Sequence, residues 1–131
     1  VERVFETMRP GEPVLLSGVK GAARALVALG LCALSSAPVV VVVPDVKTRN
    51  RVIADLSRFR EMAGPPLGLP DEVEIFPFPS WELTPYTDEW LLPGTAALRM
   101  KMLYHLTRSR RMVAVATPGA LMHRLVARAD L

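Results

Sequence analysis

Four short apolar runs recur along the chain, and a segment that can form a helix follows each of them. β-Branched residues such as valine favour strands, and continuously apolar strands are typical of a parallel sheet that is covered on both faces. Strands that alternate with helices predict an α/β domain whose parallel strands are joined by right-handed crossovers. The four runs are Val14–Leu16, Val39–Val43, Val73–Phe76 and Val113–Ala116.

The segments after these runs predict four helices. The first, from Ala22 to Leu34, is apolar nearly all round, so we expect it to be deeply buried. The second, from about Lys47 to Met62, places its apolar residues on one face. The third spans about Thr95 to Leu106, and the fourth begins at Pro118 with Thr117 as its N-cap.

Composition excludes several classes of protein. Half of the 131 residues are hydrophobic and 22% are charged, which excludes an intrinsically disordered chain. Cys32 is the only cysteine, so the chain has no internal disulfide, and we expect a buried, unreactive thiol. His105 and His123 have no cysteine or carboxylate at ligand spacing, so we expect no metal site. A net charge of +3 allows a nucleic-acid partner without indicating one.

One long uncharged stretch has two interpretations. The nineteen residues from Ala25 to Val43 carry no charge, and their length is close to that of a membrane-spanning helix. The alternative is a buried helix, a turn at Ser35–Pro38 and a buried strand, which the consecutive valines favour. The chain shows no signal-peptide pattern, so we expect a cytoplasmic protein without a membrane anchor.

A loop with two glycines follows the first run and resembles a phosphate-binding loop. In the motif G-x-x-x-x-G-K-[ST] the second glycine lets the backbone approach phosphate, the lysine binds the β- and γ-phosphates and the hydroxyl binds Mg²⁺. Gly18 fits the first position and Gly21 lies within the loop, but Ala23, Arg24 and Ala25 occupy the last three positions. Arginine is bulkier than lysine, and alanine offers no oxygen to Mg²⁺. We therefore predict a degenerate loop, without a catalytic residue, that packs a helix on a strand.

A working nucleotide site is the alternative, with Arg24 in the role of the lysine. Such a site also needs a Walker-B pair of carboxylates, an Asp-Glu at the end of a strand. Asp71 and Glu72 come before their strand rather than after it, so the sequence shows no such pair.

Two later loops resemble motifs that face nucleic acid in helicase cores. Val41–Asp45 leads into an amphipathic helix, and Val115–Leu121 is similar to a TPGRL motif with Ala120 in place of the arginine. Such loops contact a phosphate backbone through helix N-termini and small polar groups, whereas ordinary helix capping is the alternative. A solvated turn is likewise the alternative for the arginines between the third helix and the last strand. The candidate nucleic-acid contacts are Thr117, Arg108, Arg110, Arg111 and Arg124.

Residues 77–94 form a long connection that contains both tryptophans. Its aromatic residues lie beside acidic ones, a combination found at partner contacts, although tryptophans that hold the loop on the sheet are the alternative. The candidate partner contacts are Trp81, Tyr86 and Trp90, and the acidic neighbours are Glu82, Asp88 and Glu89. We assign no function to the Pro/Gly loop at residues 63–71.

The order of these segments resembles the N-terminal part of bacterial transcription-repair coupling factor (Mfd), which is similar to the excision-repair protein UvrB. The most specific piece is an FP-x-W-E-x-x-PY segment, after which a helix carries Arg99. UvrB continues from this piece into a long hairpin that grips DNA, but the interval from Tyr86 to Pro93 has no room for one. The matching residues of the segment are Phe78, Pro79, Trp81, Glu82, Pro85 and Tyr86. The similar stretches are Leu15–Ala25, Pro38–Phe59, Phe76–Tyr86, Leu98–Leu106 and Val113–Leu125.

This resemblance implies a RecA-like, P-loop-type parallel sheet flanked by helices, as the first subdomain of a UvrB-like module. Residues 13–131 would form the subdomain, after a lead-in at residues 1–12, within a larger multidomain protein. The implied role is a non-catalytic scaffold and interaction domain. The alternative is the ATP- and DNA-binding half of a UvrB- or helicase-type enzyme.

The resemblance also implies what the longer protein does. It recognises RNA polymerase stalled at a DNA lesion, displaces it with an ATP-driven translocase and recruits UvrA. We expect no cofactor in this chain, because Mg-ATP belongs to the motor domains. We expect the contact with UvrA to lie mainly in the following subdomain.

Overall fold

The computed structural model describes residues 2–35, 37–63, 73–81, 93–108, 111–123 and 125. Helices and strands alternate after a short first helix, as predicted for an α/β domain. The helices are α1 (Glu2–Thr7), α2 (Ala23–Leu34), α3 (Val46–Ala63), α4 (Pro93–Thr107) and α5 (Pro118–Met122). The strands are β1 (Val39–Val42), β2 (Glu74–Phe78) and β3 (Met112–Ala116).

The three strands form one parallel sheet in the order β1-β3-β2, so the last strand in the sequence is the central one. In the register of the sheet, Ala116 lies opposite Val42 on one side and Phe78 on the other. All five residues of β3 are buried, which is why this strand is continuously apolar.

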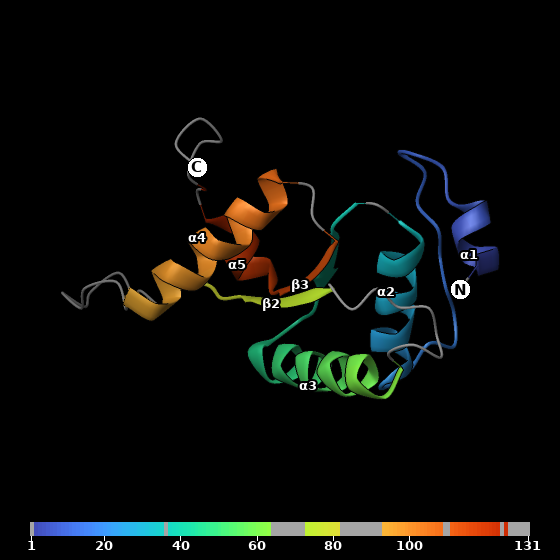
Figure 1. Ribbon diagram of the computed structural model, residues 1–131, viewed down its shortest axis with the longest axis horizontal. Helices are drawn as coiled ribbons and strands as arrows, with labels where there is room; N and C mark the ends of the chain where they lie inside the picture. Colours follow the sequence, from blue (N-terminus) through green and yellow to red (C-terminus); the bar gives the residue numbers. More distant parts are fainter. Residues whose placement is uncertain are drawn as a thin grey trace.

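Two apolar clusters cover the two faces of the sheet, because successive side chains of a strand point to opposite faces. The valines of β3 pack with α2 and α3, and its methionine and alanines pack with α4 and α5. In Figure 1, α3 runs below the sheet and α4 runs above it. The fold therefore has three layers, with helices on both sides of a parallel sheet.

The first predicted strand is wrong. Val14–Leu16 lies in no strand, and the side chain of Leu15 is 93% exposed. The run has only three residues, between Pro13 and Ser17, and none of the described strands pairs with it. Local β-propensity without a partner strand does not make a sheet, so the described part of the chain has a sheet of three strands rather than four.

Two burial predictions also need correction. Only one side of α2 is buried, with Leu26 and Leu34 at 39% and 40% exposure, because α3 and the sheet cover one face of this helix. On β1, Val40 and Val42 are 44% and 54% exposed. The helices on that face, α4 and α5, pack over β2 and β3 and leave β1 uncovered.

The uncharged stretch divides into α2 and β1, which confirms the interpretation as a helix followed by a strand. Among the residues that the structure describes, no helix is both long enough and apolar enough to cross a membrane. The helices predicted at about residues 47–62 and 95–106 are confirmed as α3 and α4. The helix predicted from Pro118 is the short α5, which follows Thr117.

Candidate site at the carboxyl edge of the sheet

The carboxyl ends of all three strands meet at one edge of the sheet. The register aligns Val42, Ala116 and Phe78, so the segments that follow these residues start side by side. In parallel sheets such an edge is where ligands bind. Pro44 and Asp45 follow β1, Pro79–Trp81 follow β2, and Thr117 follows β3.

Arg99 of α4 lies beside the part of this edge that β2 and β3 form, and it is 2% exposed. Its Nη1 atom donates to the carbonyl oxygen of Pro79 at 2.5 Å and to that of Ala120 at 3.3 Å. The guanidinium carbon lies 4.1 Å from the ring centre of Phe78 and 4.8 Å from that of Trp81. This one side chain therefore joins α4, the segment after β2 and α5.

Burial lowers the pKa of the Arg99 guanidinium, but the group stays a cation, since arginine is not deprotonated in proteins. Its Nη2 atom is buried and has no hydrogen-bond partner among the described residues. Two carbonyl oxygens and two aromatic faces thus stabilise a charge taken out of water.

Sequence reasoning assigned no role to Arg99 beyond its place in the resemblance. A signal was present, because Arg99 precedes Met102 and Leu103 by three and four positions, and all three are buried. Residues at this spacing share one face of a helix. A lone arginine on an apolar helix face indicates a buried cation with internal partners.

Trp81 is half-buried, and its ring lies over the Arg99 guanidinium, which holds it against α4. This contact is the kind expected if the tryptophan fixes the loop to the body of the domain. A partner contact at Trp81 stays a prediction. Tyr86 and Trp90, with the acidic residues beside them, lie outside the described residues.

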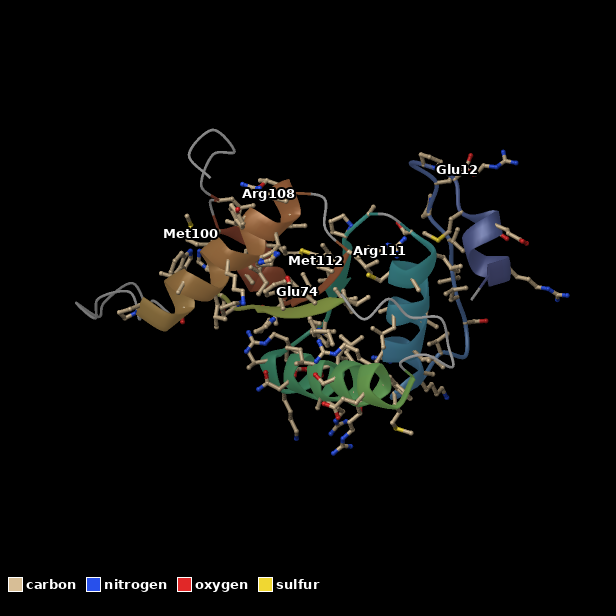
Figure 2. The ribbon with its side chains drawn as sticks, viewed as in Figure 1. Glu12, Glu74, Met100, Arg108, Arg111 and Met112 are labelled. Atoms are coloured by element: carbon tan, nitrogen blue, oxygen red, sulfur yellow. The ribbon has the colours of Figure 1, made fainter. Side chains whose placement is uncertain are left out.

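The predicted nucleic-acid contacts do not come together. Thr117 lies at the carboxyl end of β3 and is 7% exposed, whereas Arg111 precedes the amino end of the same strand. At about 3.3 Å per residue, β3 separates the two by about 20 Å. Arg108 lies at the end of α4 (Figure 2), where its guanidinium carbon is 4.8 Å from the ring centre of Tyr104. Arg110 and Arg124 lie outside the described residues, and nucleic-acid contact by these residues stays a prediction.

The glycine loop has the backbone expected of a tight turn. Gly18 and Gly21 have φ angles of 79° and 55°, in the left-handed region that favours glycine. Two amide groups that a phosphate-binding loop would offer to phosphate are engaged locally. The N–H of Ala23 donates to the carbonyl oxygen of Lys20 at 3.2 Å, and that of Arg24 donates to Gly21 at 3.3 Å.

The three replaced positions of the loop differ in exposure. Ala23 and Arg24 are exposed, whereas Ala25 is 1% exposed and packs in the core cluster of α2 and α3. A side chain at position 25 thus points into the core and away from solvent. In this backbone arrangement, a hydroxyl at that position would have no access to a hydrated metal ion.

Sequence reasoning missed a second polar contact, between α4 and β2. The Nδ1 atom of His105 lies 2.9 Å from the Oε2 atom of Glu74, and the His105 ring packs 4.8 Å from the ring of Phe76. The histidine side chain is 12% exposed, and the glutamate side chain is 45% exposed. The two residues are far apart in the sequence, so no local pattern signals the pair.

No protein-family model matches the chain. Over 126 residues it is 32% identical to the transcription-repair-coupling factor of Myxococcus xanthus. The alignment covers 95% of this chain and 10% of that protein, so the chain spans about a tenth of the length of this curated relative.

Proposed function

Because the chain is an Mfd-related region, we propose that it is a non-catalytic, N-terminal scaffold and interaction domain of a transcription-repair coupling factor. The observation that carries the proposal is the similarity, which extends over 95% of the chain. Since the chain corresponds to 10% of the relative, the activities of a whole factor belong to the proposal.

Within such a factor, we assign the chain to a RecA-like first subdomain of a UvrB-like module. Residues 13–131 form this subdomain, and residues 1–12 lead into it. A parallel sheet with helices on both faces supports the assignment.

The geometry of the glycine loop supports the absence of catalysis. The Ala25 methyl group packs in the core, and the amide groups of Ala23 and Arg24 donate to carbonyls of their own turn. Phosphoryl transfer depends on a bound metal ion and on preorganised donors for the phosphates. In this loop the position of the metal ligand is buried and two of the amide donors are engaged, which supports a role without a nucleotide cofactor.

The whole factor supplies the remaining activities in this proposal. Mg-ATP drives separate motor domains that move along DNA and displace stalled RNA polymerase. UvrA is recruited mainly through the subdomain that follows this one. In this proposal the protein acts in the cytoplasm and does not bind a membrane.

A calorimetric titration of the folded chain with Mg-ATP tests the scaffold role, with circular dichroism as the folding control. We expect no binding heat up to millimolar nucleotide, which means that the free energy of binding is less favourable than about −4 kcal/mol. Micromolar binding would contradict the proposal. It would instead favour the ATP- and DNA-binding half of a UvrB- or helicase-type enzyme, with Arg24 in the lysine's role.

A variant that restores part of the motif sharpens this test. The double substitution Ala23→Gly and Arg24→Lys changes two exposed positions and leaves the buried Ala25 intact. We expect this variant to show no ATP hydrolysis, because the metal ligand and a Walker-B carboxylate are still missing. Turnover by the folded double variant, with the unchanged chain as the control, would show that the catalytic parts are present.

A further inference from the structure

The positive charge of the chain is concentrated on α3. This helix holds five of the sixteen lysine and arginine residues but only two of the thirteen acids, so its formal charge of +3 equals that of the whole chain. The rest of the molecule is electrically balanced. The cations of α3 are Lys47, Arg49, Arg51, Arg58 and Arg60.

Three of these cations form a ridge along the outer side of α3. Lys47, Arg51 and Arg58 are all exposed, and at 3.6 residues per turn they fall within about 40° of one another around the helix axis. With a rise of 1.5 Å per residue, the ridge is about 16 Å long. The core residues of the helix, Val52 and Leu56, lie on another side and pack against the sheet.

The ridge carries cations without acidic partners in the described part of the chain. Neither acid of α3, Asp55 or Glu61, forms an ion pair with them, since the only described ion pair is between His105 and Glu74. Figure 2 shows nitrogen-tipped side chains projecting from the side of α3 that faces away from the sheet.

We propose that the ridge formed by Lys47, Arg51 and Arg58 binds the phosphate backbone of a DNA duplex. A duplex carries about one negative charge per 1.7 Å along its axis, so a straight row of about 16 Å faces several phosphates at once. Arginine forks suit phosphate oxygens in particular. This surface is separate from Thr117 and Arg111, and the inference stands independently of the proposed function.

The composition of the ridge favours nucleic acid over an acidic protein surface. Protein interfaces have a core of aromatic and apolar residues inside a polar rim. Between the three cations, the outer side of α3 carries small or polar side chains, Asn50, Ala54 and the half-buried Asp55, and the exposed Met62 lies four residues beyond Arg58. A charged surface without an apolar core is suited to a polyanion such as nucleic acid, which binds through electrostatic contacts.

The test is the binding of the full 131-residue chain to a short, fluorescently labelled DNA duplex, followed by anisotropy at increasing salt concentrations. The variant replaces Lys47, Arg51 and Arg58 by glutamine, a good helix former. We expect its affinity at low salt to fall about tenfold or more. We also expect the slope of log K against log salt to decrease by two to three, at about 0.9 per phosphate contact.

A matched control removes the same charge elsewhere, at the exposed Arg3, Arg9 and Lys101. This control should keep the salt slope of the unchanged chain, and the charge-preserving pair Arg51→Lys and Arg58→Lys should keep it as well. Circular dichroism checks that every variant is folded. The proposal is wrong if the unchanged chain does not bind DNA at low salt, or if the control loses as much affinity as the ridge variant. Displacement of the DNA by polyglutamate as readily as by unlabelled duplex would also overturn it, in favour of an acidic protein partner.

Discussion

Arg99 shows how one residue can join elements that the sequence keeps apart. Its guanidinium bridges the carbonyl oxygens of Pro79 and Ala120 and lies against the rings of Phe78 and Trp81. Those carbonyls follow two different strands, so a single cation fixes the position of both the segment after β2 and α5.

Replacement of Arg99 by methionine tests this bridge. The substitution keeps an apolar stem of similar length but leaves two carbonyl oxygens without their donor and removes the stacked cation. We expect the free energy of unfolding to fall by about 3 kcal/mol, from the lost charge-assisted hydrogen bonds and cation–π contacts. Urea denaturation measures this change.

The matched control is Arg99→Lys, which keeps the positive charge but lacks the planar fork. A single ammonium cannot reproduce both the bridge and the stacking, so we expect Arg99→Lys to lower the free energy of unfolding. Because the positive charge is kept, the decrease should be smaller than that of Arg99→Met. Equal stability of Arg99→Met and the unchanged chain would show that the bridge contributes nothing.

At the scale of elements, α3 begins at a side-chain cap. The carboxylate of Asp45 accepts hydrogen bonds from the Thr48 amide at 2.7 Å and from the Thr48 hydroxyl at 3.0 Å. These bonds lower the pKa of Asp45 from its usual value of 3.8, because they favour the ionised form. The cap also places a negative charge at the positive end of the helix dipole.

The pH dependence of stability follows from this lowered pKa. A carboxyl group whose pKa is lower in the folded state contributes fully above its unfolded pKa, and the contribution is lost as the pH falls through the folded pKa. We expect Asp45→Asn, which keeps an N-cap side chain, to be less stable than the unchanged chain at neutral pH. The difference should shrink below a pH of about 3.8. Thermal unfolding across this range measures it, and a difference that is constant with pH would contradict the assignment.

Elements whose formation depends on local pattern were predictable, and those that depend on a distant partner were not. The periodic apolar residues of α3 and the valines of β1 and β3 signal their own structure, because each buries a face against the core. Val14–Leu16 has the same local chemistry but no strand to pair with. The central role of Arg99 and the His105–Glu74 contact were missed because their partners lie many residues away and meet only in the folded chain.

At the scale of the whole molecule, the two faces of the sheet are covered unequally. Val115 is fully buried between the helix layers, whereas Val42, one strand away, is 54% exposed. Replacement of either residue by threonine keeps the shape and the β-propensity but adds a hydroxyl. We expect Val115→Thr to lower the free energy of unfolding by about 1–3 kcal/mol, the cost of burying an unsatisfied hydroxyl.

Val42→Thr is the matched comparison, and we expect it to change stability by less than about 0.5 kcal/mol, as surface substitutions do. Chemical denaturation of the two variants measures both changes. Equal losses for the two variants would show that another surface covers β1 in solution.

The strand order has a consequence for the time course of folding. Since β3 is the central strand, β1 and β2 make no direct contact in the sheet and are joined through β3, which follows both of them in the sequence. A ribosome synthesises β1 and β2 before Met112 emerges, so neither strand has its observed partner, β3, until then. Pairing between residues distant in sequence also slows folding, because the loop must close before the contact forms. The sheet can therefore assemble only after β3 has been made, and until then the apolar valines of β1 are an aggregation-prone surface.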